Sequence, residues 1–301
     1  MKTLFQVIEV WVPDSDGHLL ELADGLYCNA LDFGRVSRSM CFGRGEGLPG
    51  RVWDQARPII LKDLQGGYFR RAAAAKAAGL RCAVGMPVYA GDALRAVLVF
   101  FCGADNPDAG AIELWHNDPR VTPDLTLVDG CYGSSAEAFE AASRETFMNR
   151  GAGLPGRAWQ REGAVFMDDL AHNPKFLRAD AAGAAGIRYG LALPCPVPAQ
   201  DTYVVTFLSG SSTPVASRME CWARAATQPS LQRVFGFCEA AGKLPPGEPA
   251  APGFEADAVA AVYANAVPRV RKSAAAAGAG GLIALPIFGD AAVTEVMVLH
   301  F

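Results

Sequence analysis

The stretch Gly45-Glu46-Gly47-Leu48-Pro49-Gly50-Arg51-Val52-Trp53 returns along the chain as Gly151-Ala152-Gly153-Leu154-Pro155-Gly156-Arg157-Ala158-Trp159. Its flank returns too, because Asp63-Leu64 is repeated as Asp169-Leu170. Self-similarity at a fixed spacing is the sequence signature of repeated domains. A chain of 301 residues also exceeds the length at which one hydrophobic core keeps growing. We therefore predict an array of one domain type rather than a single large enzyme.

Outward from the first copy, strand and helix signals alternate. Pro49 suits the first turn of a helix, because its φ is fixed and it lacks an N–H group, and Pro58 ends that helix. Strands are predicted at residues 5–12, 19–22, 59–61, 81–89 and 94–101, and a second helix at 68–78, ended by Gly79. The order β-β-α-β-α-β-β predicts an α+β domain, with a central antiparallel sheet and flanking helices.

Three such units are predicted, at residues 1–105, 106–213 and 214–301. The third is identified from Arg218-Met219-Glu220-Cys221-Trp222, which resembles the first strand, and from Pro286, which matches Pro87 and Pro194. Its middle differs, because residues 243–247 replace the Gly-Leu-Pro-Gly-Arg turn and the strand signal that follows the turn is lost. Residues 254–277 are rich in alanine and are predicted to be helical. We expect this unit to be a shortened, diverged cap of the array.

Composition limits the partners. The net charge is −4 and there is no dense basic run, so neither nucleic acid nor an anionic membrane is an expected partner. The longest apolar run, residues 96–102, is too short to span a bilayer. The eight cysteines include no C-x-x-C pair and no zinc-binding spacing, so we expect no metal and read them as free thiols of a cytoplasmic protein.

Several phrases of the first unit together resemble GAF domains, the small-molecule-sensing domains of phosphodiesterases, phytochromes and bacterial regulators. The phrases are residues 47–53, Asp63-Leu64, 78–81, 86–88 and 97–101. The second unit matches nearly as well, and the third matches only at its two ends. The resemblance implies a ligand pocket between the sheet and the segment before Gly79, and binding rather than catalysis. The Asn-Lys-Phe-Asp/Glu series of cyclic-nucleotide binders and the Cys-His neighbours of bilin binders are missing, so no cofactor is named.

The residues that would lie beside this pocket are aromatic or basic. Paired arginines there can hold a carboxylate or phosphate by forked hydrogen bonds, or they can belong to a solvated helix face. The tryptophan of the repeated turn can stack on a ring ligand, although such a residue more often anchors a helix to its sheet. The candidate ligand-binding residues are Trp53, Tyr68, Phe69, Arg70, Arg71, Lys76, Cys82, Phe176 and Arg178. The first unit carries the denser set, so we place an anionic ligand there first.

Three functions fit these observations. The first is a non-enzymatic sensory or regulatory protein that binds a small molecule, because no catalytic constellation is present. Its output would pass to a protein partner or arise from self-association, since the chain ends at a strand with no further domain. The second is a thiol-dependent reductase of the free methionine sulfoxide type, tested by changing Cys41 and Cys82. The third is a structural scaffold whose pockets are filled by side chains.

Overall fold

The repeated turn begins a helix in both copies, as the sequence predicts. Helix α2 (Gly47–Gln55) and helix α5 (Gly153–Arg161) each begin at a glycine with positive φ, 54° and 58° respectively. Gly50 has no room for a side chain, because a Cβ atom there would lie 2.0 Å from the carbonyl oxygen of Gly43. With Gly45, whose φ is 79°, three glycines of the first copy are therefore favoured by backbone geometry. The computed structural model describes residues 2–103, 110–133, 136–199, 201–225, 230–250, 253–272, 280–289 and 292–301.

The first sheet has the strand order β3-β2-β1-β6-β5-β4. Its strands are β1 (Phe5–Pro13), β2 (Leu20–Leu26), β3 (Cys41–Phe42), β4 (Ile59–Leu61), β5 (Leu80–Ala90) and β6 (Ala93–Gly103). Besides α2, helices α1 (Leu31–Ser37) and α3 (Ala72–Ala77) belong to this part of the chain. The second predicted helix is thus shorter than residues 68–78, because Phe69 and Arg71 turn into the core before α3 begins. The sequence did not predict α1.

The second sheet repeats this order, with the counterpart of β3 reduced to an isolated bridge between Leu125 and Met148. It runs β8-β7-β11-β10-β9, with the strands β7 (Gly110–Asn117), β8 (Thr126–Tyr132), β9 (Val165–Met167), β10 (Tyr189–Pro196) and β11 (Thr202–Ser209). Helices α4 (Glu137–Glu145) and α6 (Ala179–Ala184) accompany α5. All strand pairs in both sheets are antiparallel, which confirms the predicted fold class.

The third sheet has six strands in the order β14-β13-β12-β17-β16-β15, the same arrangement as in the first. Its elements are β12 (Arg218–Arg224), β13 (Leu231–Cys238), β14 (Gly242–Leu244), α7 (Phe254–Asn265), β15 (Arg269–Lys272), β16 (Gly281–Gly289) and β17 (Ala292–His300). The predicted helix over 254–277 is wrong beyond Asn265. Ala266 takes a left-handed φ of 57° and ends α7, and β15 then pairs with β16 as β4 pairs with β5. Residues 273–277 lie outside the described ranges.

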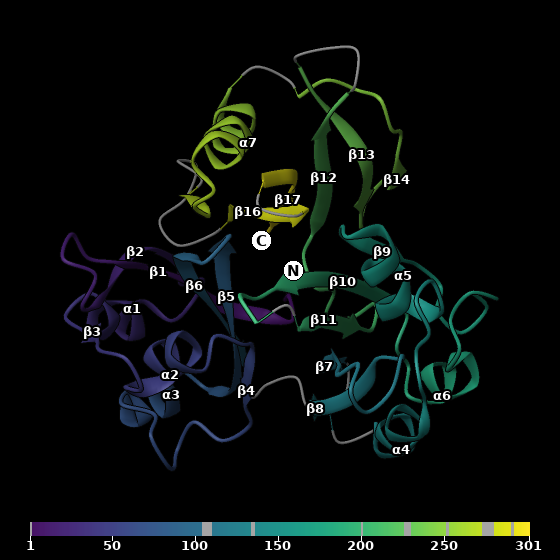
Figure 1. The fold of residues 1–301 in the computed structure, drawn as a ribbon, viewed down its shortest axis with the longest axis horizontal. Coiled ribbons are helices and arrows are strands. Elements are labelled where there is room, and N and C mark those ends of the chain that lie inside the picture. The colour runs from purple at the N-terminus through teal and green to yellow at the C-terminus, as the bar shows by residue number, and fades with distance from the viewer. Residues whose placement is uncertain are drawn as a thin grey trace.

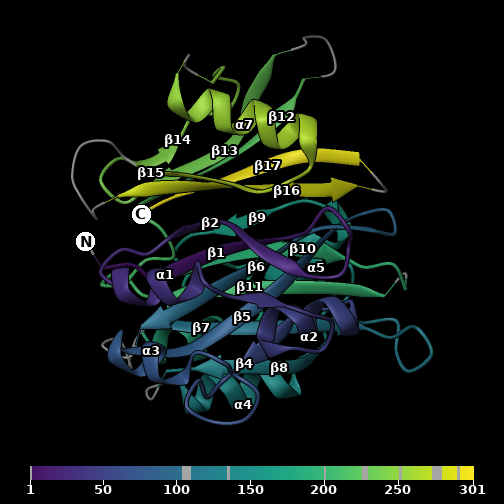
Figure 2. The same ribbon diagram turned by 90° about the vertical axis from the view of Figure 1, so that its left-hand side faces the viewer.

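Each sheet has an inner and an outer face. Along β1, Ile8 and Val10 point to one side, and Val7 and Trp11 point to the other. The outer faces are covered by α1–α3, by α4–α6 and by α7, and the inner faces of all three sheets form one common core. Figure 1 shows the sheets around this centre with the helices outside, and Figure 2 shows the same layers from the side.

The matched prolines mark the middle of the common core. Pro87, Pro194 and Pro286, one from each sheet, line a single cavity of about 30 Å³. They stand at corresponding places on β5, β10 and β16, so the three sheets meet in a pseudo-threefold arrangement. The Cys195 thiol donates to the carbonyl oxygen of Pro87 at 3.5 Å, which joins the second sheet to the first.

An ion pair crosses each of the three junctions. Lys62, which follows β4, lies 2.7 Å from Asp129 on β8. Asp168, which follows β9, lies 3.1 Å from Lys243 on β14. Lys272, at the end of β15, lies 3.2 Å from Asp24 on β2, so the ring of three sheets closes. The boundary predicted at residues 105 and 106 lies outside the described ranges, and the division into three domains stays a prediction. None of the helices in the described ranges is long and apolar enough to cross a membrane.

Candidate functional site

A buried carboxylate lies beneath the outer helices of the first sheet. Glu9 on β1 has no exposed surface, although it sits in a strand of apolar residues. It accepts hydrogen bonds from the Trp11 indole at 3.0 Å, from the Tyr27 hydroxyl at 3.2 Å and from Arg71 Nη1 at 2.6 Å. The same Arg71 nitrogen donates to Ser37 Oγ at 2.5 Å. Charge-assisted bonds of this kind offset the cost of burying the carboxylate.

The Arg71 guanidinium is enclosed by aromatic rings. Its Cζ atom lies 4.6–5.8 Å from the ring centroids of Trp11, Phe33, Phe42, Phe69 and Phe101. Only 1% of its side chain is exposed. Nε and Nη2 are buried and have no hydrogen-bond acceptor among the described residues. The rings attract the cation through their faces, but two strong donors of Arg71 remain without an acceptor.

The second sheet repeats this cluster residue by residue. Glu113 accepts from Trp115 at 3.0 Å, from Tyr132 at 3.1 Å and from Arg178 at 2.5 and 3.1 Å. Arg178 also donates to Ser143, the counterpart of Ser37. Here Nη2 of the arginine donates to the carboxylate. Of the three side-chain nitrogens of Arg178, only Nε therefore lacks an acceptor among the described residues. The second cluster is therefore more nearly satisfied than the first.

The interaction between Arg178 and Glu113 affects the pKa of the Glu113 carboxyl. Burial alone would raise the pKa of Glu113, but Arg178, Ser143 and Trp115 hold it below its ordinary value. Burial, followed by the neighbouring carboxylate, raises the pKa of Tyr132 and of its counterpart Tyr27. Both hydroxyls thus stay protonated and donate to the carboxylates.

The third sheet keeps the carboxylate but changes its partners. Glu220 is fully buried and accepts from Arg218 at 2.8 and 2.9 Å and from Arg233 at 2.7 Å. His300 Nε2 lies 3.7 Å from Glu220 and 3.7 Å from Glu255, which are ion-pair rather than hydrogen-bond distances. Burial would lower the pKa of His300, but the two carboxylates raise it to about 9. These three residues bring ligand atoms within 4.8 Å of one another, yet two guanidinium groups already neutralise Glu220.

Sequence reasoning missed the carboxylates, although a signal was present. Each first strand carries Glu-x-Trp, as Glu9 with Trp11, Glu113 with Trp115 and Glu220 with Trp222. A charged residue repeated at an outer-face position, where its neighbours are apolar, indicates a buried ion pair.

The candidate residues of the first unit fall into two groups. Phe69 and Arg71 belong to the buried cluster. Trp53 is 6% exposed and packs into the outer core, with Arg44 Cζ 4.8 Å from its ring. Tyr68 is half-buried, under the Arg51 guanidinium at 3.8 Å.

The remaining candidates lie apart from this cluster. Arg70 is exposed and lies 3.6 Å from Glu46, and Lys76 is exposed on α3. Cys82 points to the inner face of its sheet. In the second unit, Phe176 and Arg178 are in contact, with the arginine Cζ 5.1 Å from the ring. The structure therefore brings together one aromatic and one arginine of each predicted set.

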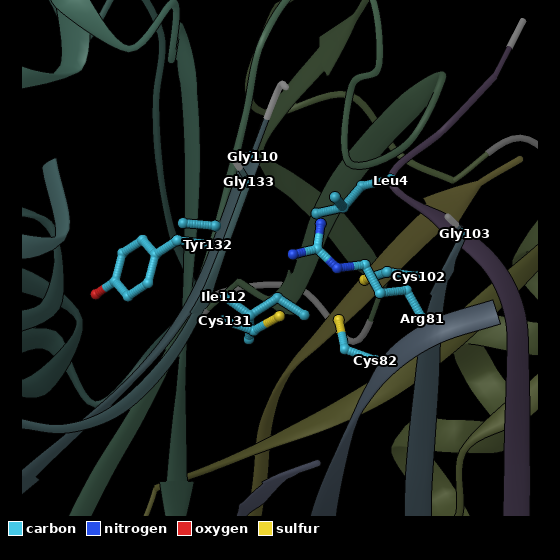
Figure 3. Close-up of a pocket in the computed structure, with 11 residues that line it drawn as sticks. Leu4, Arg81, Cys82, Cys102, Gly103, Gly110, Ile112, Cys131, Tyr132 and Gly133 are labelled. Atoms are coloured by element: carbon cyan, nitrogen blue, oxygen red, sulfur yellow. The ribbon is translucent and has the colours of Figure 1, made fainter. Parts of the chain in front are cut away.

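Cys82 lines a different space. A cavity of about 30 Å³ lies between the first and second sheets, and Cys82, Cys102, Cys131 and Arg81 are among its lining residues (Figure 3). Larger openings lie beside the second unit. One of about 430 Å³ is lined by Trp159, Tyr203 and Arg150, among others, and one of about 520 Å³ by residues that include Arg157 and Phe166.

Comparison with protein families matches residues 2–117 to the family described as GAF domain. This segment is similar to GAF domains. The buried Glu9–Arg71 cluster lies inside it, between its sheet and its helices. A comparison with curated proteins finds no match.

Solved structures are similar to about a third of this chain. The GAF domain of nlh2 from A. aeolicus in an inactive state is 16% identical, with 33% of this chain and 58% of that chain covered and a TM-score of 0.27. The GAF domain of a phosphoenolpyruvate-protein phosphotransferase from Coxiella burnetii is 17% identical over 36% and 58% of the two chains, with a TM-score of 0.27. Free methionine-R-sulfoxide reductase from Neisseria meningitidis, in complex with its substrate, is 17% identical over 33% and 51%, with a TM-score of 0.25. This chain thus covers little more than half of these three chains, and the family assignment rests on residues 2–117.

Proposed function

We propose that the chain is a non-enzymatic, cytoplasmic sensory or regulatory protein of three GAF-like units, in which the first unit binds a small anionic molecule. The observation that carries the proposal is the pair of buried Arg71 donors, Nε and Nη2, that have no acceptor among the described residues. Leaving a buried donor unpaired costs about 1–3 kcal/mol, and more on a charged group. A carboxylate or phosphate would accept from both nitrogens in forked geometry.

The aromatic rings define the rest of this ligand. Phe33, Phe69 and Phe101 surround the guanidinium, so a flat or apolar group joined to the anion would pack against them. Because these rings now fill the space around Arg71, the ligand reaches it only if one of them, such as Phe69, moves outward. Arg178 has one free donor where Arg71 has two, which supports binding in the first unit before the second.

A competition test follows from the Glu9–Arg71 pair. Glu9 already neutralises this guanidinium through Nη1 and would repel an anion bound at Nε and Nη2, so Glu9→Gln should tighten ligand binding by about tenfold or more, the equivalent of one charge-assisted bond. Glu113→Gln makes the same change in the second unit and should leave the affinity unchanged. The ligand would first be found by thermal shift with carboxylate- and phosphate-bearing metabolites, and its affinity then measured by calorimetry.

The filled space favours one alternative, the scaffold. Under that hypothesis Glu9 and Arg71 are a permanent structural pair. No anion would then stabilise the wild-type protein, and the Glu9→Gln and Glu113→Gln proteins would behave alike. That result would replace the sensory proposal.

For the reductase alternative, Cys41 and Cys82 do not form a reactive pair with each other. Cys41 is on β3 and Cys82 is on β5, and strands β2, β1 and β6 separate these two in the sheet. Four strand spacings amount to about 19 Å, too far for a nucleophile and a resolving thiol. Assay of sulfoxide reduction by the Cys41→Ala and Cys82→Ala proteins tests this alternative directly.

A further inference from the structure

The junction between the first and second sheets contains a cluster of cysteines. Cys82 and Cys102 are cross-strand partners on β5 and β6, and Cys131 comes from β8 of the second sheet. All three line the cavity of about 30 Å³, which holds about one or two water molecules. Thiols that border so small a space on two different sheets are within reach of one another.

Two of the sulfur atoms face each other across this cavity. In Figure 3 the sulfur atoms of Cys82 and Cys131 lie on facing sides of the cavity, and the Cys102 sulfur lies beside Arg81 on the Cys82 side. The Cys82 thiol, followed by burial, raises the pKa of Cys131, while the Cys102 thiol is the first cause that raises the pKa of Cys82. Cys82 is 4% exposed, whereas Cys131 is only partly buried. A reagent from solvent therefore meets Cys131 first.

We propose that Cys82 and Cys131 are a modification site at which a small hydroperoxide forms a disulfide between the first and second units. The Cys131 sulfur attacks one peroxide oxygen, the O–O bond breaks, and the departing oxygen leaves as an alcohol or water with the thiol proton. The Cys82 sulfur then attacks the Cys131 sulfenic acid, and its hydroxyl leaves as water with the Cys82 proton. Two thiols are oxidised and one peroxide is reduced.

The position of Cys131 connects this bond to the second buried cluster. Its neighbour Tyr132 donates to Glu113, so a bond at Cys131 acts on a strand that positions this donor. The raised pKa keeps the thiolate scarce near neutral pH, so the pair responds to a high peroxide concentration rather than to traces. A disulfide between Cys82 and Cys102 would instead lie within one sheet and join no units.

Peptide mapping of the full chain after hydrogen peroxide treatment tests the proposal. Under non-reducing conditions we expect a cross-linked peptide pair that contains Cys82 and Cys131, with the mass loss of two hydrogen atoms, reversed by dithiothreitol. Cys82→Ser and Cys131→Ser should each abolish it. Cys102→Ser and Cys195→Ser, which replace other buried thiols, should retain it.

Thermal unfolding of the wild-type protein gives a second readout that needs no variant. The bond closes a loop of the chain between the two units, so the oxidised protein should unfold about 5 °C or more above the reduced one. The proposal is overturned if both thiols remain free while other cysteines oxidise, or if Cys82 pairs with Cys102. An unchanged unfolding temperature of a fully cross-linked protein would overturn the coupling of the units.

Discussion

Replacement of Arg178 by methionine tests the buried pair of the second unit most directly. The change removes both bonds to Glu113, at 2.5 and 3.1 Å, and leaves a carboxylate with no exposed surface. Removal of one partner from a buried ion pair costs about 3–5 kcal/mol. The carboxyl can avoid the unpaired charge by taking up a proton. From its ordinary pKa of 4.5 to pH 7 this costs about 3.5 kcal/mol, so we expect a loss of roughly that size.

The loss should depend on pH. In the wild-type protein the folded pKa of Glu113 is depressed, so its contribution is present above the ordinary value and is lost as pH falls through the folded pKa. Without Arg178, burial dominates and the folded pKa is raised. The loss in free energy of unfolding of the variant is then largest at neutral pH. It is smallest once Glu113 is protonated in both the folded and the unfolded protein. The gap between the two proteins should therefore narrow by most of its size between pH 7 and about pH 4.5.

Urea unfolding followed by tryptophan fluorescence measures this gap at both pH values. Arg144→Met is the matched control, because Arg144 forms an exposed pair with Glu140 and its loss should cost less than about 1 kcal/mol. A loss below about 1 kcal/mol for Arg178→Met at pH 7, or an equal loss at both pH values, would refute the reasoning.

Three further predictions concern other parts of the chain. The folded pKa of His300 is raised to about 9, so its contribution is complete below its ordinary value of 6.5 and is lost as pH rises through 9. His300→Gln should therefore flatten the fall in unfolding temperature between pH 7 and 10. Gly50→Ala should destabilise the protein by about 2 kcal/mol or more in urea, because its Cβ would meet the backbone of Gly43 at 2.0 Å, whereas Gly85→Ala would meet only side chains. Deletion of residues 214–301 should produce self-association in size-exclusion chromatography, because it uncovers the inner faces of two sheets; a monomeric, folded remainder would contradict the closed ring.

The fold class followed from local signals that the structure preserves. The positive-φ glycines of the repeated turn and Pro58 set the bounds of α2, and alternating apolar residues set the strands. The sequence did not predict β15 because this strand has only four residues and lies next to an alanine-rich run. Three of the four, Arg269, Arg271 and Lys272, are basic. Their strand conformation comes from pairing with β16, which is a non-local interaction.

The candidate site was predicted only in part, for a similar reason. Phe69, Arg71, Phe176 and Arg178 were placed beside the pocket by the family resemblance. Their partners are far away along the chain, since Glu9 lies 62 residues before Arg71. Local sequence patterns indicate which residues are buried, but they do not indicate which acidic residue forms an ion pair with which arginine.

The central prolines, Pro87, Pro194 and Pro286, have a consequence for how such a chain can change over time. Residues near them are constrained by two neighbouring sheets at once, so a substitution there disturbs three units together. Outer-face residues form a separate core with the helices of their own sheet, so each sheet can vary them with less effect on the others. The part of the chain that forms the third sheet illustrates this freedom. It has other residues in place of the Gly-Leu-Pro-Gly-Arg turn, and a different arginine, Arg233, bonds to its buried Glu220. Its strand order is nevertheless the same as in the first sheet. A chain with three such sheets can thus specialise one outer face at a time.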